Sequence, residues 1–440
     1  MGVSSRRRFL RTVTTSLAAT TLLNTGRSRA AGANDRVRVA TIGCGNQGKA
    51  HIKSLSTLKN VEIANVCDVD KDRLAAAATL AGSGAKPISD FRRILDDSSI
   101  DGVTIATPDH WHAPIALLAL EAGKNVYVEK PCCHNVREGQ LLLAATKKSG
   151  KAVAHGTQSR SNAAIQQAIK MLNDGIIGDI LIAKCWNWQL RENIGHKQPS
   201  APPANVDYDA WVGPAEWMPY QENRFHYNWH WWYNFGCGDL GNDGIHEFDY
   251  TLWGLGAKTH PSIVSAAGGK YFFDDDQEFP DTQQITFEYP DDGKVGHRKM
   301  LIYEMRLWST TYPFNVDSGV EYYGTKGKMF ISKRGKFEVK GERNAPVDVK
   351  LDGNPLATVP ENQQNWVDCI RSGDQPNANM EVAVRTATAI HLGNIATRLQ
   401  RTVHFDPSTE KIVGDSEASV LLSRKYRDAG YWGIPKGITA

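Results

Sequence analysis

Glu129 and Lys130 stand side by side at the end of a short apolar run, Asn125 to Val128, and Pro131 follows them directly. Alternating valines around a tyrosine are typical of a buried strand, so the pair lies at the carboxyl end of that strand. In open parallel sheets ligands bind at this edge, and the proline restricts the direction in which the chain continues. An ammonium group fixed there can polarise a hydroxyl oxygen and stabilise negative charge that develops on it. A surface salt bridge at a strand end is the alternative interpretation.

A histidine with an amide and an acid shortly before it follows a glycine-rich stretch. His246 is preceded by Asn242 and Asp243, four and three residues earlier. On a helix, residues three and four positions apart share a face, so either side chain lies beside the imidazole. Asp243 can supply a carboxylate there, whereas Asn242 cannot take a proton. A buried histidine that only caps the helix is the alternative.

The residues that lead to Asp68 predict a dinucleotide site. A strand turns through Gly43-Cys-Gly-Asn-Gln-Gly48 into a helix, and a second strand ends at Asp68, twenty residues beyond Gly48. Glycines permit the tight turn and close phosphate approach, the helix N-terminus attracts the pyrophosphate, and the acid suits ribose hydroxyls. Because Asp68 repels a 2′-phosphate, NAD is favoured over NADP, although Lys71 and Arg73 weaken that preference. The loop residues assigned to the cofactor are Gly43, Gly45, Asn46, Gln47 and Gly48.

Strand and helix patterns alternate through the first 157 residues. Helices are expected after the turn at Gly43 to Gly48 as far as about Lys59, near 73–81, after Ser89 or Asp90, before Gly123 and over 136–148, and strands over 36–42, 61–67, 102–107, 125–128 and 151–157. Such alternation requires a parallel, doubly wound sheet. The expected fold class is therefore α/β, with an N-terminal Rossmann domain at residues 35–157.

Three motifs in a fixed order carry a family resemblance. The glycine fingerprint, Pro108 with His112, and Glu129-Lys130-Pro131 resemble the Gfo/Idh/MocA oxidoreductase family. The resemblance implies that Lys130 lies beside the nicotinamide and the sugar hydroxyl being oxidised. It also implies a homodimer or homotetramer built on the sheet of the second domain. The cofactor contacts expected are Thr107, Pro108, His112, Glu129, Lys130 and Gln158, and Arg160 is placed with the substrate.

The resemblance has one departure, at the second catalytic motif. Many members of the family have an Asp four residues before a catalytic His at the start of a helix. The corresponding residues here are Asn242 and His246, so an amide replaces the usual carboxylate. Asp243 is the neighbouring acid that can take its place.

From Ser161 onward strands follow one another with few helices between them. The expected elements are a helix over 161–173, strands over 180–188, near 263, and over 284–289, 299–307, 320–323 and 328–332, and helices over 362–371 and 382–400. This pattern predicts a C-terminal α+β domain, residues 158–430, with a large, mainly antiparallel sheet half-covered by helices. The two late helices either cover that sheet or return to the nucleotide domain.

Eight of the 12 tryptophans lie between Trp186 and Trp253. Within this region Phe225 to Tyr233 has no regular periodicity, and aromatic planes interleaved with Asn and His suit stacking against sugar rings. The residues assigned to the substrate are Trp188, His226, Trp229, His230 and Trp231. An aromatic core or a subunit interface is the alternative. His226 and His230 have the i, i+4 spacing of metal ligands, but no third ligand completes a set, so no metal is expected.

The first 31 residues carry six basic side chains and no acid, and Ser5-Arg-Arg-Arg-Phe-Leu-Arg11 before a weakly apolar run resembles a twin-arginine export signal. We therefore expect an exported, periplasmic protein that meets the twin-arginine translocase. Without this segment the formal charge falls from +3 to −3, so binding to nucleic acid is not expected. The seven cysteines show no Cys-x-x-Cys spacing and are expected to be mostly buried thiols.

Together these features predict an NAD-dependent oxidoreductase that acts on a secondary hydroxyl of a sugar, polyol or glycoside. His246 would accept the hydroxyl proton while Lys130 stabilises the oxygen. One rival is glycoside cleavage by transient oxidation and elimination, as in the NAD-dependent α-N-acetylgalactosaminidases, which share the fold but lack the Glu-Lys-Pro motif. The other is a catalytically silent sugar-binding protein, which Asn242 favours. Because an exported enzyme meets almost no free NAD, the cofactor is expected to stay bound through turnover.

Overall fold

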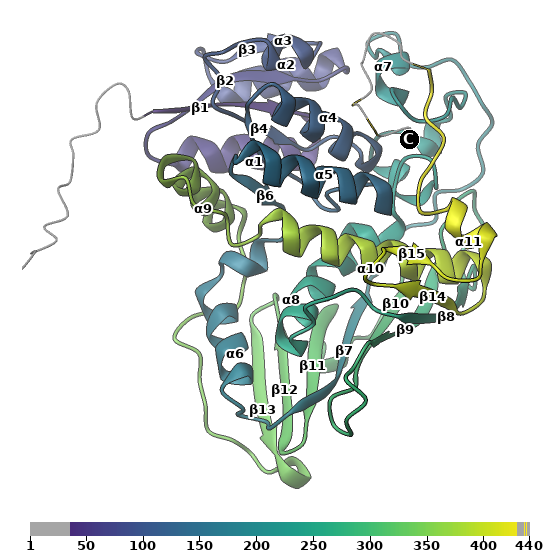
Figure 1. Ribbon diagram of the computed structural model, residues 1–440. Coiled ribbons are helices and arrows are strands. Elements are labelled where there is room, and N and C mark those ends of the chain that lie inside the picture. Colours follow the sequence, from purple (N-terminus) through teal and green to yellow (C-terminus); the bar gives the residue numbers. More distant parts are fainter. Residues whose placement is uncertain (1–35, 429–434, 436, 438–440) are drawn as a thin grey trace, which may run out of the picture. The chain divides into compact units, whose positions relative to one another are not determined.

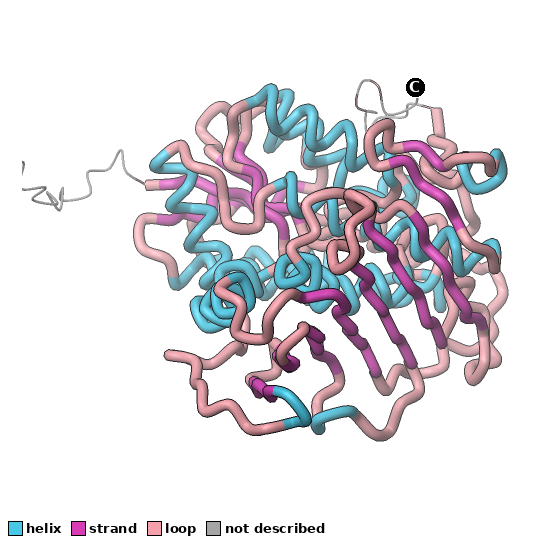
Figure 2. Tube along the Cα trace, turned by 60° about the horizontal axis from the view of Figure 1, so that its bottom comes forward, coloured by secondary structure: helices cyan, strands magenta, loops and turns pink. Residues whose placement is uncertain are grey.

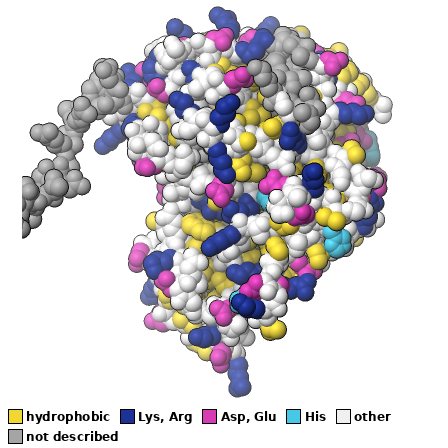
Figure 3. Space-filling view, in the orientation of Figure 1, with side chains coloured by type: hydrophobic (Ala, Val, Ile, Leu, Met, Phe, Trp, Pro, Cys, Tyr) yellow, Lys and Arg dark blue, Asp and Glu magenta, His cyan; other side chains and the backbone are white. Residues whose placement is uncertain are grey.

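The computed structural model describes residues 36–428, 435 and 437, so the predicted export signal lies outside the described residues. The described chain forms two sheets with helices packed on them (Figure 1). All seven cysteines are free and buried, which confirms the expectation for these thiols. No described helix is long and apolar enough to cross a membrane. On the face in Figure 3, basic and acidic side chains are interspersed.

The first sheet has six parallel strands in the order β3-β2-β1-β4-β5-β6. The strands are β1 (Val37–Ile42), β2 (Val61–Cys67), β3 (Lys86–Ile88), β4 (Gly102–Ile105), β5 (Asn125–Val128) and β6 (Val153–His155). The helices between them are α1 (Asn46–Thr57), α2 (Lys71–Ala81), α3 (Arg92–Leu95), α4 (Asp109–Glu121) and α5 (Val136–Ser149). This confirms the doubly wound Rossmann arrangement. The three-residue β3 was not expected, and the helix expected after Asp90 is only the short α3.

The second sheet has nine strands in the order β13-β12-β11-β7-β10-β9-β8-β14-β15, and only β7 and β10 pair in parallel. The strands are β7 (Ile180–Trp188), β8 (Ile263–Gly269), β9 (Thr282–Tyr289), β10 (Lys299–Arg306), β11 (Ser318–Gly324), β12 (Gly327–Ser332), β13 (Lys336–Gly341), β14 (Val403–Asp406) and β15 (Lys411–Ile412). A large, mainly antiparallel sheet is therefore confirmed. Figure 2 shows its strands side by side. The sequence did not predict β13, β14 and β15, which are short or polar.

The remaining helices cover one face of this sheet or join the two halves. They are α6 (Ala163–Asn173), α7 (Tyr208–Val212), α8 (Ile245–Leu255), α9 (Val359–Ser372), α10 (Met380–Leu399) and α11 (Ser416–Val420). Helix α9 returns to the nucleotide domain, where Trp366 Nε1 donates a hydrogen bond to the Ala152 carbonyl at 3.1 Å. Helix α10 packs against α5 on one side and β8 on the other. The two late helices therefore differ, since one closes the first sheet and the other connects both domains.

Candidate active site

A cleft of about 290 Å³ runs from the glycine loop to the aromatic segment and is lined by both domains. From the first domain it includes Gly43, Gly45, Asn46, Gln47, Asp68, Thr107, Pro108, His112, Glu129 and Lys130. From the second domain it includes His226, Tyr227, Trp229, His230 and Asn242. The volume is close to the lower end of the range for small-molecule pockets. The fold therefore joins most residues that the sequence assigned separately to cofactor and to substrate.

Glu129 is buried at the base of this cleft and links the glycine loop to the end of β5. Its Oε1 accepts hydrogen bonds from Gln47 Nε2 and His51 Nε2, both at 2.8 Å. Burial alone would raise the pKa of Glu129, but the hydrogen bond and charge of His51 outweigh it, and the pKa lies well below its usual value. A Cβ atom at Gly156 would lie 2.6 Å from Glu129 Oε2, so only glycine fits beside the carboxylate. Glu129 is thus ionised and fixed in position, and its Oε2 accepts a hydrogen bond from the main-chain amide of Lys130 at 3.2 Å.

Lys130 reaches across to the second domain. Its Nζ donates to the main-chain carbonyl of Asn242 at 2.6 Å and to the Asn242 side-chain oxygen at 3.1 Å. The amide group of Asn242 is oriented in turn, because its Nδ2 donates to Asp239 Oδ1 at 2.9 Å. The lysine is therefore held in the cleft by neutral oxygen atoms, and the side chain that holds it is the asparagine that replaces the family's usual acid.

The segment before α8 does not have the regular helical geometry that the sequence predicted. Leu240–Gly244 forms a π-helical turn, which is wider than an α-helical turn. Asn242 consequently turns towards Lys130, whereas Asp243 turns away to Lys333 Nζ at 3.0 Å and Arg191 at 3.3 Å. Burial would raise the pKa of Asp243, but the charge of Lys333 contributes most to lowering it well below the usual value. Asp243 is therefore an ion-pair residue and does not take the position that Asn242 leaves without a carboxylate.

His246 is the second residue of α8 and is partly exposed. It is not among the residues that line the cleft. Burial, followed by the charges of Lys333 and Lys130, lowers the pKa of His246 well below that of a free histidine. The imidazole is consequently neutral at pH 7. Among the described residues no hydrogen bond orients either of its ring nitrogens.

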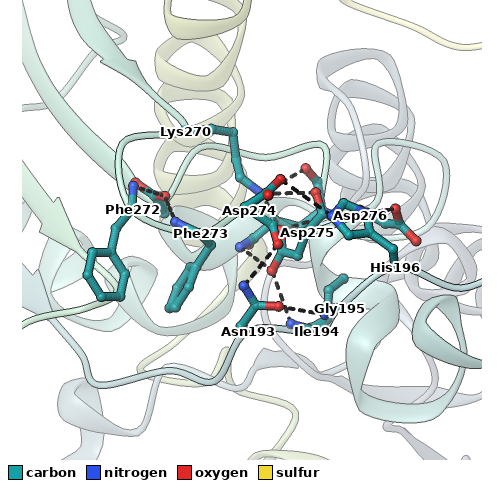
Figure 4. Close-up of polar contacts among 12 residues, drawn as sticks. Asn193, Ile194, Gly195, His196, Lys270, Phe272, Phe273, Asp274, Asp275 and Asp276 are labelled. Carbon is teal, nitrogen blue, oxygen red and sulfur yellow. Dashed lines mark hydrogen bonds and ion pairs between the residues drawn. The ribbon is translucent and has the colours of Figure 1, made fainter.

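Three loops of the second domain are tied together by the carboxylate of Asp276, on the segment 270–277 (Figure 4). Asp276 Oδ2 accepts hydrogen bonds from Asn223 Nδ2 at 2.9 Å and from the Lys197 amide at 2.9 Å. Its Oδ1 pairs with His196 Nδ1 at 2.7 Å. These hydrogen bonds fix Asn223, which lies just before the aromatic segment Phe225 to Tyr233. Within that segment the Trp229 ring stacks on His230, with 3.6 Å between the ring centroids. The aromatic wall of the cleft is thus built from irregular backbone held by side chains.

Two sequence profiles match almost the whole described chain. The profile described as an oxidoreductase family with an NAD-binding Rossmann fold matches residues 37–157, and the profile for the C-terminal alpha/beta domain of the same family matches residues 161–432. The chain belongs to the Gfo/Idh/MocA oxidoreductase family. The resemblance drawn from the three motifs is thereby confirmed.

Individual relatives of this Gfo/Idh/MocA protein carry different activities. The scyllo-inositol 2-dehydrogenase (NAD(+)) of Bacillus subtilis is 24% identical over 381 residues, which cover 81% of this chain and 95% of that protein. A glycosyl hydrolase family 109 protein of Saccharopolyspora erythraea is 30% identical, but the match covers only 38% of each chain. The WlbA dehydrogenase from Bordetella pertussis, solved with NADH and UDP-GlcNAcA, has a TM-score of 0.64 at 21% identity over 84% of this chain and 98% of that chain. That likeness shows the common fold.

NAD is the cofactor of this family's Rossmann domain, and the glycine loop fits it. Gly43 has a φ of +88°, and a Cβ there would lie 2.5 Å from the Ala106 carbonyl oxygen. A Cβ at Gly48 would lie 1.9 Å from the Gly43 carbonyl oxygen, so glycine is required where α1 leaves the loop. Gly48 therefore supports the loop without lining the cleft. The backbone is left open for a pyrophosphate at the N-terminus of α1.

Asp68 lies in the cleft at the end of β2, where the ribose of a dinucleotide binds in this fold. Its carboxylate accepts hydrogen bonds from the Cys44 amide at 2.6 Å and the Asp70 amide at 2.9 Å. Burial raises the pKa of Asp68 above its usual value, and these two hydrogen bonds oppose that rise. An acid held in this way favours ribose hydroxyls over a 2′-phosphate, although Arg73 also lines the cleft.

Several predicted site residues lie elsewhere. Arg160 is paired with Asp249 at 2.8 Å in a second cavity, so its guanidinium is not free for a substrate in the cleft. Trp231 is only 3% exposed and belongs to the core of the second domain. Trp188 lies under the guanidinium of Arg306, 3.9 Å from it. The residues assigned to the site that do not line the cleft are Gly48, Gln158, Arg160, Trp188, Trp231, Asp243 and His246.

The two histidines with metal-ligand spacing are held in different surroundings. His226 Nε2 lies 3.6 Å from Asp70 Oδ2, at the edge of the nucleotide domain. His230 bonds the main chain of its own turn through Nδ1. Within the described part of the chain, no group of three His, Cys, Asp or Glu side chains is arranged to hold a metal ion.

Asp109 was not singled out from the sequence, although it stands between Pro108 and His112 at the end of β4. It lines the cleft at the first position of α4 and is 1% exposed. Burial raises the pKa of Asp109 to about 7, while the charge of Lys130 opposes the rise. Asp109 follows shortly after the carboxyl end of β4, where ligands bind in this type of sheet, and that position is the sequence signal that could have identified it. The site therefore contains a second acid near Lys130, one that titrates close to neutral pH.

Replacing Asp109 by asparagine should flatten the pH dependence of stability. The folded state holds a proton on Asp109 up to about pH 7, whereas an unfolded Asp releases it near pH 3.8. Stability contributed by this protonation is fully present below the unfolded pKa of 3.8 and is lost progressively as pH rises to the folded pKa of about 7. Between pH 5 and pH 7 the loss is at most about 3 kcal/mol, at 1.4 kcal/mol per unit. Urea unfolding of Asp109→Asn at pH 5 and pH 8 should show a drop smaller by that amount. The exposed Asp96→Asn should keep the wild-type drop, and an unchanged drop in Asp109→Asn would contradict the assignment.

Proposed function

We propose that this protein is an NAD-dependent oxidoreductase that oxidises a secondary hydroxyl of a sugar, polyol or glycoside. The observation that carries the proposal is the unbroken cleft, in which Lys130 lies between the dinucleotide loop and an aromatic wall. Aromatic faces with interleaved polar groups suit a sugar ring. The NAD(+)-dependent inositol dehydrogenase among the relatives, which matches over most of both chains, supports this class of substrate.

The chain's own side chains supply positioning and charge stabilisation. When bound, NAD supplies the hydride acceptor. Lys130 Nζ, directed into the cleft by Asn242, donates a hydrogen bond to the substrate oxygen and stabilises its developing negative charge. A neutral imidazole takes the hydroxyl proton, and the family resemblance assigns this role to His246. Glu129 does not exchange protons with substrate, since it is ionised and bound to His51 and Gln47.

The direct test is a panel of inositols, hexoses and methyl glycosides offered to the purified protein, read at the nicotinamide absorbance. A compound that reduces the bound cofactor supports the proposal. Bound NAD that no compound on the panel reduces would favour the catalytically silent sugar-binding protein instead. Oxidation of simple primary alcohols with equal efficiency would contradict the substrate class.

A second candidate function is glycoside cleavage by transient oxidation, elimination and return of the hydride. The similarity to two glycosyl hydrolase family 109 proteins, over 38% and 36% of this chain, favours it. The same panel distinguishes the two functions when chromogenic glycosides are included. Release of the aglycone without accumulation of NADH identifies cleavage, whereas NADH without aglycone identifies net oxidation.

We further propose that the protein is exported by the twin-arginine route with NAD already bound, and that the cofactor stays bound through turnover. A segment of the second domain is hydrogen-bonded to the rim of the nucleotide site. The Lys71 amide donates to the Asn205 carbonyl at 3.0 Å, and the Asp207 amide donates to the Val69 carbonyl at 3.0 Å. Val69 and Lys71, which make these bonds, follow closely after Asp68 in the chain. Dissociation of the nucleotide would be slowed if these contacts must first open. By resemblance alone, we also propose a homodimer or homotetramer.

Retention of the cofactor predicts about one NAD per chain in protein isolated from the periplasm after expression of the full sequence. The change to test is Asn205→Ala, which removes side-chain hydrogen bonds to Asp70 at 3.2 Å and Asp72 at 2.9 Å and should speed nucleotide loss. The exposed Asn377→Ala serves as control. A ligand at a thousand times its dissociation constant stabilises a fold by about 4 kcal/mol, so stripping should lower the melting temperature.

Two outcomes would contradict this proposal. Empty periplasmic protein that is active only while NAD is supplied would defeat retention. Lysine substitution of Arg6 and Arg7 should leave the protein in the cytoplasm, and unchanged export of that variant would defeat the route.

A further inference from the structure

His230 differs from the other histidines of the site in how its two ring nitrogens are used. Its Nδ1 lies 2.5 Å from the main-chain carbonyl oxygen of Tyr227. A carbonyl oxygen can only accept, so Nδ1 carries the hydrogen and Nε2 carries the lone pair. Burial and the charge of Lys130 lower the pKa of His230 well below its usual value, which keeps the ring in this neutral tautomer.

The lone pair of His230 is not used by the protein. His230 lines the cleft, and its Nε2 has no hydrogen-bond partner among the described residues. This nitrogen is also not fully buried, in contrast to Nδ1 of His51 and Nε2 of His155, which are buried and have no partner. His112 gives a second contrast, because its two nitrogens lie 2.7 Å and 2.8 Å from main-chain oxygens. One edge of His230 is therefore held by the protein, and the other is presented to a ligand.

The expected proton acceptor, His246, lacks such an arrangement. A base needs a hydrogen bond that fixes its tautomer and direction, and none is present for His246 among the described residues. The acid that the family places four residues earlier is Asn242, which instead holds Lys130, and Asp243 is held by Lys333 and Arg191. His112 also lines the cleft, but main-chain oxygens lie beside both of its nitrogens, whereas His230 is oriented through Nδ1 and keeps Nε2 without a protein partner.

We propose that His230, rather than His246, accepts the hydrogen bond and then the proton of the hydroxyl that is oxidised, while Lys130 donates to the oxygen of the same group. This inference rests on the proposed function. The O–H proton moves to Nε2, the C–H bond is lost as hydride to NAD+, and the carbonyl bond forms. A ketone has no hydrogen to offer, so the same lone pair disfavours the product. His230 thus lets the site distinguish an alcohol from its ketone before any reaction.

Binding measurements without turnover test this distinction. Trp229, stacked on His230, provides a fluorescence signal, and the probes are an inositol and its keto derivative, then a methyl glucoside and its keto derivative. NADH-loaded protein is used for the alcohols and NAD-loaded protein for the ketones, so that neither reacts. His230→Asn can keep the bond to Tyr227 but lacks an acceptor at Nε2, whereas His230→Gln can place an oxygen there.

We expect His230→Asn to weaken alcohol binding about tenfold, as for one lost hydrogen bond, and to leave ketone binding unchanged. His230→Gln should retain most of the alcohol preference and should still lose turnover, because an amide cannot take a proton. His246→Asn should retain the alcohol preference, as should the exposed control His404→Asn. Circular dichroism and nucleotide content establish that each variant is folded and loaded.

Two results overturn the inference alone. Equal weakening of alcohol and ketone in His230→Asn would show a merely structural histidine, and loss of the preference in His246→Asn would return the role to that residue. If no polyol, glycoside or ketone binds to or reacts with the wild-type protein, the proposed function fails and the inference falls with it.

Discussion

Replacement of Lys130 by methionine is expected to lower turnover on the true substrate about a thousandfold, with the bound NAD content unchanged. Lys130 is the described cation in the cleft whose Nζ is directed by two oxygen atoms of Asn242. Loss of an electrostatic stabiliser of a developing oxyanion typically costs about 10²–10³ in turnover, and loss of an acid–base group costs about 10²–10⁴. The measurement is a single-turnover reduction of the bound cofactor, followed at 340 nm, as that wavelength is standard for NADH.

Arginine at the same position separates charge from geometry. Lys130→Arg keeps the positive charge, but a planar guanidinium cannot take the position of the compact ammonium group between the two oxygens of Asn242. This variant should therefore recover only part of the rate. The exposed Lys170→Met should react as wild type. Near wild-type turnover in Lys130→Met would remove the lysine from the mechanism.

Replacement of Glu129 by alanine is expected to lower the free energy of unfolding by about 3–5 kcal/mol, the usual cost of removing one partner of a buried ion pair. His51 Nε2 and Gln47 Nε2 would both lose their acceptor in the interior. Glu129→Gln keeps the volume and an acceptor oxygen, so it should cost less. Urea unfolding monitored by tryptophan fluorescence measures both variants.

The exposed Glu192→Ala provides the comparison, since surface changes usually alter stability by less than about 0.5 kcal/mol. The double variant His51→Ala with Glu129→Ala should cost less than the sum of the two single changes, because each removes the same interaction. If Glu129→Ala is no more costly than Glu192→Ala, Glu129 is not the anchor of the glycine loop.

The local sequence was sufficient where one element determines its own geometry. The nine residues Ile180–Trp188 form β7 with the predicted bounds, since a long apolar strand needs no distant partner to be recognised. The loop from Gly43 to Gly48 was equally readable, because Gly43 has a positive φ of +88° and a Cβ at Gly48 would meet the nearby Gly43 carbonyl oxygen. The parallel first sheet followed from the alternation of strands and helices.

Features that depend on distant contacts could not be predicted in this way. The π-helical turn that separates Asn242 from Asp243 lies where a Cβ at Gly244 would come within 2.3 Å of the Tyr303 hydroxyl, a contact from β10. In the sequence His51 is an ordinary residue of the first helix, and only the fold brings it to Glu129, which follows β5. Trp231 was placed with the substrate because composition shows an aromatic cluster but not which rings face its core.

The return of α9 to the first sheet also constrains the order in which the molecule can be completed during synthesis. Asn362 Nδ2 donates a hydrogen bond to the Tyr127 hydroxyl at 3.0 Å, across 235 residues of chain. Trp366 likewise packs in the core around Tyr127, which remains without that cover until α9 leaves the ribosome. The nucleotide half is first in the gene but is among the last parts to be closed, so translation of nearly the whole chain precedes the finished cofactor domain. A gene truncated after residue 157 would therefore encode a sheet with an uncovered apolar face rather than an independent nucleotide-binding module.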